Sequence, residues 1–514
     1  MWRWGVAGLL GSVWGCTVTG LEAVPVRVEC DVGAGLPCVQ VVGLPATSVR
    51  EATARIRSAL RNSGLDFPLR RVTVNLAPAE IRKQGSGLDL PMAAAILKAS
   101  GQLGERRTDD FLLVGELGLD GTVAPVAGVL AMALLARQSG RNLVVPVASG
   151  PEAAAVPEVE VFTVDRLSHF VAWTRGGELP RPTSGQEHAS GPEGPDLADI
   201  RGHELPKRAL CAAAAGGHHL LLIGPPGAGK TMLASSLVRL LPPLSSAESL
   251  EVTRIWSVAG MLPPGQGLMR NRPWRAPHPH LSKAGLVGGG SHTIRPGEVS
   301  LGHLGVLFLD EMNRFPGDTL EALRGPLEEG RVTLGRLGAG VTFPARCLLV
   351  AAMNPCHCGR RGDPEHPCQC TGQQVARYWD RLSGPLLDRI DLQVEVRRLK
   401  WHEWQGASTG LSSRQAAALV TEARARQAVR LASVGKRLNA EMNGREVERL
   451  CPLPSEAEQM LAEAFCRLAL SSRGYHRILK VARTLADLDG AAHIGRGHLS
   501  EALAFRCLHW LRRP

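Results

Sequence analysis

Short apolar runs alternate with amphipathic segments along the first third of the chain. The strand-like runs lie at residues 26–30, 72–76 and 142–147. Between them, apolar residues recur every three or four positions, as on one face of a helix, at residues 48–63, 90–99 and 127–139. This alternation predicts an α/β or α+β region. The apolar start of the chain, up to residue 16, superficially resembles a secretory signal, but it continues directly into strand-like sequence. We interpret it as a first strand or as the result of a misplaced start codon.

A polar segment then interrupts the pattern. Residues 176–195 are rich in Gly, Pro, Ser and Glu and lack apolar periodicity, which is typical of a solvated linker. Beyond it, residues 200–396 resume a β/α alternation, and residues 415–511 have largely helical spacing. We therefore predict four parts, namely residues 1–175, a linker at 176–196, a second α/β unit at 197–398 and a helical unit at 399–514.

Composition narrows the class of protein. A chain of 514 residues with 44% hydrophobic and 21% charged residues is an ordinary globular protein of about three domains, which excludes a single small binding module and global disorder. The formal net charge of +11 favours acidic partners such as nucleic acid without proving one. No apolar run reaches the roughly 18 to 20 residues of a membrane span, so we expect no membrane partner.

A phosphate-binding motif follows the linker. The apolar run at residues 219–223 leads into a glycine-rich loop and then into a helical pattern, which is the strand–loop–helix context that this motif requires. Backbone amides of the loop and the helix N-terminus can surround phosphates, the lysine can contact the outer phosphates, and the threonine hydroxyl can bind Mg²⁺. The residues predicted to bind the nucleotide are Gly224, Pro225, Pro226, Gly227, Ala228, Gly229, Lys230 and Thr231.

Two further apolar runs end in polar residues suited to nucleotide hydrolysis. Residues 306–309 lead into Asp310, which we expect in the Mg²⁺ shell, and Glu311, which we expect to polarise the attacking water as a base. Residues 347–353 lead into Asn354, whose amide can orient that water or contact the γ-phosphate. The alternative for Asn354 is a simple turn residue before Pro355. Together these residues predict an ATP- and Mg²⁺-dependent hydrolase in the cytoplasm.

Several motifs in residues 275–391 closely resemble the magnesium-chelatase-like AAA+ ATPases of the YifB/ComM family. They are APHPH, LVGGGSHTIRPGE, GVLFLDE, AAMNPCHCG and LSGPLLDRIDL, and the likeness extends to GLPCVQVVGLP near the start and SSRGYHRILKVARTLADL near the end. The resemblance implies a P-loop AAA+ core with a helical lid, preceded by an α+β domain similar to the Lon protease and ribosomal S5 domain 2 folds. It also implies a hexameric ring that acts on single-stranded or branched DNA, as a helicase in branch migration, recombination and competence, with recombination proteins as further partners.

The same resemblance assigns two arginines to a site shared between subunits. Arg389, in LLDRID, is similar to the arginine finger that reaches the γ-phosphate held by a neighbouring subunit. Arg473, in SSRGYHR, is similar to the lid arginine that contacts nucleotide, with Arg477 as the second choice. The alternative for Arg389 and Arg473 is an ordinary surface pair with a nearby acid.

Two glycine-rich loops carry the residues we expect to contact DNA. The insertion at residues 283–298 carries Lys283, His292 and Arg295, and residues 330–346 are predicted to form a hairpin that carries Arg331 and Arg336 around a turn at 338–340. Basic side chains there could grip phosphates in a salt-sensitive way that is independent of base sequence. The alternative is that the loops only pack subunits together. The basic helix expected at residues 414–437, with Arg424, Arg426 and Arg430, could add charge for DNA contact, but we interpret it as a solvated helix face.

Four of the twelve cysteines form a cluster in sequence. Two Cys-x-Cys pairs flank a polar loop rich in Pro and Gly, and four thiolates can hold such a loop around one tetrahedral Zn²⁺. The predicted zinc ligands are Cys356, Cys358, Cys368 and Cys370, within a loop at residues 356–370. Free thiols in a reducing compartment or a redox pair are the alternatives.

The likeness of the first domain to Lon proteases raises the hypothesis of a peptidase. Lon-type catalysis needs a serine and a lysine. By alignment the serine position falls at Gly87 and the lysine position at Leu130, and the nearby Ser86 has no lysine as a base. We therefore expect the catalytic dyad to be missing. The two rival functions are an ATPase of the chelatase or chaperone type that remodels a protein partner, and an ATP-dependent Lon-like protease.

Overall fold

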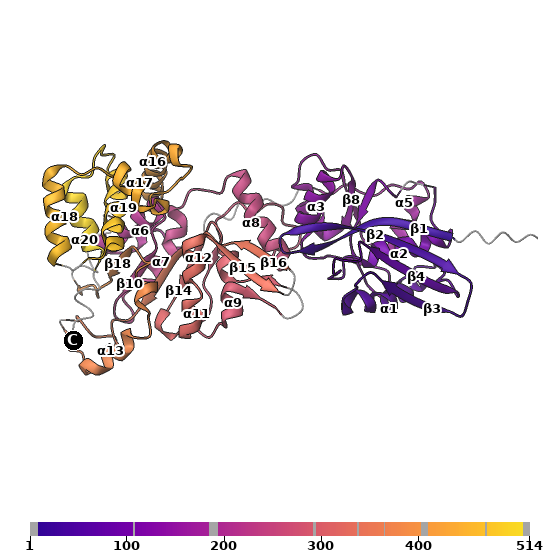
Figure 1. Ribbon diagram of the computed structural model, residues 1–514, viewed down its shortest axis with the longest axis horizontal. Coiled ribbons are helices and arrows are strands. Elements are labelled where there is room, and N and C mark those ends of the chain that lie inside the picture. The colour runs from indigo at the N-terminus through magenta and orange to yellow at the C-terminus, as the bar shows by residue number, and fades with distance from the viewer. Residues whose placement is uncertain are drawn as a thin grey trace, which may run out of the picture.

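The structure is a computed structural model. It describes residues 9–105, 108–183, 194–290, 294–336, 339–363, 365–401, 410–467 and 470–506. Two lobes follow one another along the longest axis, with the first third of the chain in one lobe and the remainder in the other (Figure 1). Across the described ranges, no helix is both long enough and apolar enough to cross a membrane.

The first lobe is built on a mixed seven-stranded sheet. Its order is β3 (Cys38–Val42), β4 (Arg71–Ala77), β2 (Glu22–Gly33), β1 (Leu9–Thr19), β5 (Phe111–Leu113), β8 (Asn142–Pro146) and β9 (Val161–Val164). The ladders β1–β2 and β2–β4 are antiparallel and the others are parallel. Strand β1 confirms from Leu9 onward the interpretation of the apolar start as a strand, and a short antiparallel pair, β6 (Glu116–Leu117) and β7 (Val123–Ala124), lies outside this sheet.

Helices pack on this sheet through faces that the apolar spacing anticipated. They are α1 (Thr47–Asn62), α2 (Asp89–Ala99), α3 (Val129–Gln138), α4 (Gly150–Ala154) and α5 (Leu167–Thr174). In α1 the buried residues Val49, Ala52, Ile56 and Ala59 recur every three or four positions, as a helix with one face on a core requires. The predicted strands and helices of this region are thus confirmed to within a few residues at each end.

The second lobe is centred on a five-stranded parallel sheet. Its order is β11 (Trp274–Arg275), β14 (Val306–Leu309), β17 (Leu348–Met353), β10 (Leu220–Ile223) and β18 (Leu392–Glu395). Alternate residues of β10 enter two different cores, since Leu220 and Leu222 face one cluster and Leu221 and Ile223 face the other. The strand is therefore apolar throughout, which is typical of a parallel sheet covered on both faces.

Helices and two small β-ladders surround this sheet. The helices are α6 (Glu204–Gly216), α7 (Lys230–Ser236), α8 (Ser246–Ala259), α9 (Lys283–Val287), α10 (Glu298–Leu301), α11 (Gly317–Glu321), α12 (Arg324–Glu329), α13 (Gly372–Trp379) and α14 (Gly384–Leu387). The ladders are β12 (Gly288–Gly289) with β13 (Arg295–Pro296), and β15 (Arg331–Arg336) with β16 (Ala339–Pro344). Both ladders are antiparallel and lie outside the main sheet.

The end of the chain is helical, as its spacing predicted. The helices are α16 (Ser413–Leu431), α17 (Gly444–Leu450), α18 (Ser455–Arg467), α19 (Ser472–Leu488) and α20 (Arg496–Ala504). They share one hydrophobic core with α6 and with one face of the five-stranded sheet. Two basic residues expected on a solvated face instead point inward, because Arg424 donates to the Ala214 carbonyl oxygen at 2.6 and 2.9 Å and Arg430 pairs with the buried Asp487. That expectation was wrong because helix periodicity does not reveal which polar groups a neighbouring helix offers.

The two lobes meet at α8 and at the hairpin β15–β16 (Figure 1). Leu21, from the turn between β1 and β2, is buried with Ile255 of α8 and with Val341 and Phe343 of β16. At the edge of this contact Arg254 pairs with Glu22 at 2.9 Å. The first lobe therefore packs on strand β16 of the hairpin that we expected to contact DNA.

A buried carboxyl group lies in the same contact between the lobes. Glu152 of α4 accepts hydrogen bonds from the Leu130 backbone N–H at 2.7 Å and from the hydroxyl of Ser257 in α8. Burial raises the pKa of Glu152 from 4.5 to about 7. The folded chain thus keeps this proton up to about pH 7, whereas the unfolded chain loses it near pH 4.5. This group therefore makes the folded state less stable as pH rises between these two values.

Replacing Glu152 with glutamine is expected to remove that part of the pH dependence. The amide keeps an acceptor for Ser257 and Leu130 but has no proton to lose, so Glu152→Gln should unfold at a higher temperature than the parent chain at pH 8 and at nearly the same temperature at pH 5. Thermal unfolding measured across this range checks the difference, with exposed Glu80→Gln as the control. Equal pH profiles for Glu152→Gln and the parent chain would contradict it.

Candidate nucleotide site

The glycine-rich loop joins the buried strand β10 to helix α7. Gly227 and Gly229 have φ values of +78° and +83°, in the left-handed region that side chains with a Cβ rarely adopt. A Cβ at either position would meet no heavy atom within 4 Å. The backbone conformation, rather than crowding, therefore requires glycine, and the loop surface stays open for a ligand to approach.

Lys230, the first residue of α7, folds back over the loop. Its Nζ donates to the carbonyl oxygens of Gly224 and Pro225 at 2.7 and 2.9 Å and to Oδ1 of Asn354 at 3.1 Å. Burial lowers the pKa of Lys230, while Asp310 and Glu311 act against that decrease. The ammonium group thus lies inside the curve of the loop, where phosphate oxygens can replace the carbonyl acceptors.

The acidic residues reach the same place from the neighbouring strands. Strand β17 lies between β10 and β14, and all three are parallel, so their carboxyl ends meet at one edge of the sheet. Thr231 Oγ1 donates to Oδ2 of Asp310 at 3.0 Å, and Oδ1 of Asp310 accepts the backbone N–H of Glu311 at 2.9 Å. A hydroxyl and a carboxylate in contact are the oxygen ligands that Mg²⁺ prefers. Thr231 and Asp310 therefore fit the metal that we predicted for them.

Glu311 has a backbone conformation that is unusual for its residue type. Its φ is +48°, which costs energy in a residue other than glycine, and residues in such conformations cluster at functional sites. The side chain is 42% exposed and pairs with Arg314 at 2.9 Å. Sequence reasoning did not identify Arg314, because an arginine three residues beyond the acids belongs to no motif that it used.

Asn354 is held by aromatic residues that carry no sequence signal of their own. The Tyr378 hydroxyl donates to the Asn354 carbonyl oxygen at 3.0 Å, and Nε1 of Trp379 donates to the Pro355 carbonyl oxygen at 3.1 Å. Both residues belong to α13 and are buried. This support fixes the end of β17, so that the Asn354 amide faces Lys230.

The two arginines assigned by resemblance lie toward the amino-terminal ends of the strands, opposite the carboxyl ends that carry the phosphate loop. Arg389 precedes β18, which runs parallel to β10, and it pairs with Glu328 and donates to the Pro385 carbonyl oxygen at 2.8 Å. Arg473 is exposed and contributes with Arg389 to lowering the pKa of Glu328. Neither arginine lies at the phosphate loop of its own chain.

The second choice for the lid position, Arg477, has a structural partner at the same ends of the strands. Its Nε lies 3.5 Å from Oδ1 of Asp391, and His218 Nδ1 lies 2.9 Å from the other oxygen of the same carboxylate. Burial favours the neutral form of Asp391, but the hydrogen bond and charge of His218, together with Arg477, hold its pKa well below the usual range. Arg477 therefore joins α19 to the base of the sheet.

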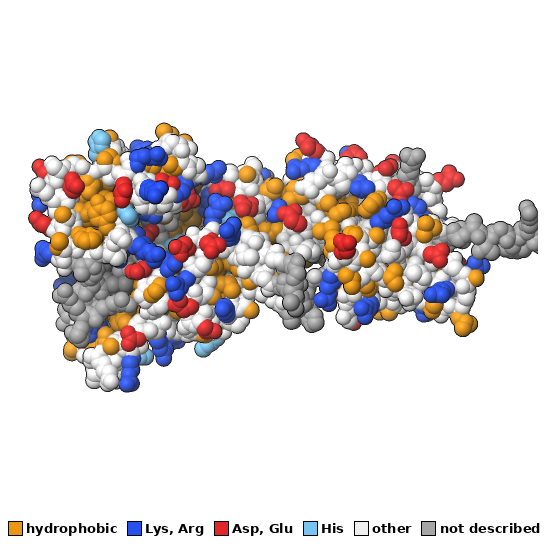
Figure 2. Space-filling model, viewed as in Figure 1, with side chains coloured by type: hydrophobic (Ala, Val, Ile, Leu, Met, Phe, Trp, Pro, Cys, Tyr) orange, Lys and Arg blue, Asp and Glu red, His pale blue; other side chains and the backbone are white. Residues whose placement is uncertain are grey.

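The residues expected to contact DNA are only partly described. Lys283 of α9 and Arg295 of β13 are exposed, and Arg331 of β15 is exposed and lies 3.4 Å from Glu329. His292 and the side chain of Arg336 lie outside the described residues. On the face shown in Figure 2, basic and acidic side chains of the described residues are interspersed and form no single basic surface. Any binding of DNA phosphates on this face would therefore involve basic residues of particular loops rather than one extended basic surface.

The predicted hairpin is present, but its turn lies elsewhere. Ala339 and Gly340, expected within the turn, instead pair with Arg336 and Gly335 in the ladder. The connection therefore falls at residues 337–338, which lie outside the described residues. Turn placement from glycine content was wrong here because glycine also occupies strand positions, as Gly335 and Gly340 do.

The four cysteines converge after β17. Cys356 Sγ lies 3.4 Å from Cys358 Sγ and 3.6 Å from Cys368 Sγ, and the four sulfurs, including that of Cys370, all lie within 4.8 Å of one another. These separations exceed the roughly 2.05 Å of a disulfide bond. They are close to the roughly 3.8 Å between sulfurs that share one tetrahedral ion through bonds of about 2.3 Å. The thiols therefore fit a single Zn²⁺.

The first lobe has no serine–lysine pair at the positions where a peptidase would need it. Gly87 has no side chain, and Leu130 is fully buried. The Ser86 hydroxyl donates to the Glu116 carboxylate, and the buried Lys83 donates to the Pro78 carbonyl oxygen. Ser86 thus has an acid rather than an amine as its partner.

Comparison with known proteins finds relatives over most of the chain. Family models match three parts of the chain: "Subunit ChlI of Mg-chelatase" at residues 28–149, "Magnesium chelatase, subunit ChlI" at 196–404, and "Magnesium chelatase, subunit ChlI C-terminal" at 410–506. The YifB protein of Salmonella typhimurium is 43% identical over 95% of both chains. The competence protein ComM of Haemophilus influenzae is 41% identical over 97% of this chain and 98% of its own.

A more distant relative is the magnesium-chelatase 38 kDa subunit of Rhodobacter capsulatus. It is 27% identical over 56% of this chain and 79% of its own length. By contrast, the likeness to YifB and ComM extends over both lobes at more than 40% identity. The chain therefore belongs to the YifB/ComM family of magnesium-chelatase-like proteins.

Proposed function

We propose that this protein is a ring-forming AAA+ ATPase that couples ATP hydrolysis to movement along DNA, as in branch migration during recombination and competence. Membership of the magnesium-chelatase-like family supports ATP hydrolysis at the level of the family. Residues 197–398 would form the AAA+ core, 399–514 the helical lid, and 1–175 a Lon-like domain without its dyad, joined by a linker at 176–196. The protein would act in the cytoplasm, with ATP and Mg²⁺ as cofactors.

One observation supports this proposal more than any other. Lys230 donates a hydrogen bond to Asn354, and Thr231 donates one to Asp310, at the carboxyl ends of neighbouring strands of the parallel sheet. This arrangement can hold a triphosphate and its Mg²⁺, with Glu311 beside them as the base. A second copy in a ring could bring Arg389, with Arg473 near it, to this site. Hydrolysis would then depend on assembly.

DNA as the partner is supported by a relative and by the basic loops. One relative over almost the whole chain is a competence protein. Lys283 and Arg295 are exposed on the α9–β13 insertion, and Arg331 is exposed on the hairpin. Exposed lysine and arginine on such loops bind phosphates without reading base sequence, and the affinity then falls steeply with salt.

The test is the ATPase rate of the full chain against DNA structure and salt. We expect single-stranded and branched DNA to stimulate ATPase several-fold, and the stimulation to decline between about 50 and 200 mM salt. The double variant Arg295→Glu with Arg331→Glu should lose the stimulation and keep the basal rate. Arg496→Glu, at an exposed arginine of α20, serves as the control. An ATPase that ignores every DNA would contradict the proposal and favour an ATPase that remodels a protein partner.

A further inference from the structure

The loop that carries the four cysteines packs directly on the phosphate loop. Gly359 has a φ of +73°, and a Cβ at this position would lie 2.6 Å from Cδ of Pro226. Its backbone N–H donates to the Cys356 carbonyl oxygen at 3.0 Å. The cysteine cluster and the nucleotide loop are therefore in van der Waals contact through a glycine that lies between two of the cysteines.

A second connection runs through strand β17. Cys356 comes two residues after Asn354, whose amide accepts the hydrogen bond from Lys230. At the same level the Gly224 backbone N–H donates to the Met353 carbonyl oxygen at 3.1 Å. A shift of Cys356 would therefore move the backbone of the two preceding residues, and with it the Asn354 amide that contacts Lys230.

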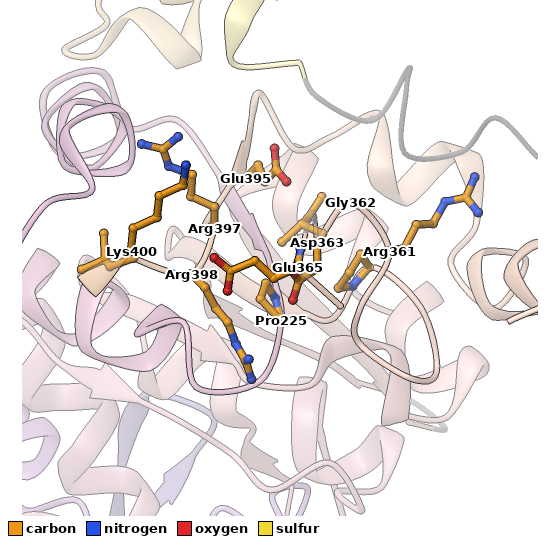
Figure 3. A pocket seen from close by; sticks show the side chains of 13 residues that line it. Pro225, Arg361, Gly362, Asp363, Glu365, Glu395, Arg397, Arg398 and Lys400 are labelled. Atoms are coloured by element: carbon orange, nitrogen blue, oxygen red, sulfur yellow. The ribbon is translucent and has the colours of Figure 1, made fainter. Parts of the chain in front are cut away.

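The two loops also form opposite walls of one cavity. The cavity has a volume of about 200 Å³ and lies between Gly224 and Pro225 on one side and the described part of the cysteine loop on the other, with residues 397–400 after β18 as a third wall. The residues that the cysteine loop contributes are Arg361, Gly362, Asp363 and Glu365. Figure 3 shows Asp363 and Glu365 of the cysteine loop near Pro225, and Arg398 lines the same cavity. A nucleotide on the phosphate loop would have the cysteine loop as its neighbour.

The cysteine loop has little core of its own. Among its described residues only Cys356 and Gly359 are buried, and no helix or strand occurs between β17 and α13. A polar loop of this kind keeps a single conformation when a metal ion ties it together, because metal binding replaces the missing hydrophobic contacts. Four sulfurs within 4.8 Å of one another suit one ion, and four thiolates leave no open position for catalysis.

We propose that Cys356, Cys358, Cys368 and Cys370 hold one Zn²⁺ whose presence sets the affinity of the phosphate loop for ATP. The zinc-bound loop keeps Gly359 on Pro226 and holds Asp363 and Glu365 as the wall of the cavity. Loss of the ion frees the loop, removes that wall and loosens the phosphate loop. The coupling rests on the proposed function because it assumes that ATP binds at Lys230. The assignment of the zinc site makes no such assumption.

Metal content tests the site itself. Elemental analysis of the purified full chain should find about one zinc per chain. Cys368→Ser should lose most of it, while Cys38→Ser, at an exposed cysteine in the first lobe, should keep it. A chain that contains no zinc, contains iron instead, or keeps its zinc in Cys368→Ser would overturn the assignment.

ATP affinity tests the coupling. Titration with a fluorescent ATP analogue should show that chelator-treated protein binds about tenfold more weakly, and that added Zn²⁺ restores binding. Gly359→Ala should keep its zinc and still bind about tenfold more weakly, since the methyl group must displace Pro226. Gly64→Ala is the matched control, because Gly64 has a φ of +71° and open space around it.

Two results would overturn the coupling. Equal ATP affinity with and without zinc would show that the ion only stabilises its own loop. Equal affinity in Gly359→Ala and Gly64→Ala would show that the contact with Pro226 has no effect on the nucleotide. A parent chain that holds zinc and binds no ATP would contradict the proposed function and the coupling together, while it would support the zinc site.

Discussion

Replacing Glu311 with glutamine is expected to stop ATP turnover while ATP binding persists. Glutamine has nearly the same shape, but its amide cannot accept a proton from the attacking water. Removing a general base of this kind lowers kcat by about 10²- to 10⁴-fold. Lys230, Thr231 and Asp310, which we expect to hold the nucleotide and its metal, keep their positions because their hydrogen bonds do not involve the Glu311 side chain.

The ion pair of Glu311 does not change this expectation. Arg314 is 66% exposed, and an exposed pair of this kind contributes about 1 kcal/mol or less. Phosphate release under saturating ATP measures turnover, and titration with labelled ATP measures binding in the same preparation. Glu160→Gln, in an exposed ion pair with Arg181 on the first lobe, is the control and should hydrolyse ATP normally. Undiminished hydrolysis in Glu311→Gln would remove this carboxylate from the mechanism.

Removing the guanidinium of Arg389 should be as damaging as removing the phosphate-loop lysine, although the two residues lie at opposite ends of the strands. Arg389→Ala is expected to lower ATPase by about 10³-fold or more, as loss of an arginine finger does. Lys230→Ala is expected to abolish nucleotide binding. Within one chain Arg389 contacts Glu328 and the Pro385 carbonyl oxygen, so its effect on hydrolysis must come through a neighbouring copy.

Mixing the two inactive variants tests whether Arg389 acts on the nucleotide site of a neighbouring copy. In a ring assembled from equal amounts of both, about a quarter of the interfaces combine an intact phosphate loop from Arg389→Ala with an intact arginine from Lys230→Ala. ATPase activity should therefore reappear in the mixture. The control is Arg381→Ala, at an exposed arginine close to Arg389 in sequence, which should hydrolyse ATP without being mixed with a second variant. No recovery on mixing, or a protein that stays monomeric with ATP and DNA, would contradict a site shared between subunits.

Much of the nucleotide site could be predicted because its signals are local. The glycines, Lys230 and Thr231 are contiguous, and Asp310 follows a strand that is recognisable by its own apolar run. Arg314 and Tyr378 could not be predicted in the same way. Each acts on a residue brought to it by the fold, and an arginine or a tyrosine in such a segment has many other uses.

Errors in the sequence interpretation have the same origin. Arg424 and Arg430 have the spacing of a solvated helix face, yet α6 and α19 supply a carbonyl oxygen and a buried carboxylate for them. Similarly, the pairing of Glu152 with Ser257 joins residues 105 positions apart. Burial of a polar group depends on the partner that the fold supplies, and no local pattern records that partner.

Local patterns along the chain were enough to predict the main strands and helices, the position of the phosphate loop, and the occurrence of four cysteines in one short loop. These properties follow from apolar periodicity and from residues that are neighbours in the chain, so they need no knowledge of long-range contacts. Three other features depend on long-range packing, namely that Asn354 contacts Lys230 across 124 positions, that the cysteine loop packs on Pro226, and that Arg389 lies away from the phosphate loop of its own chain. The strand order β14-β17-β10-β18 differs from the order along the chain, and such crossovers set which distant residues meet.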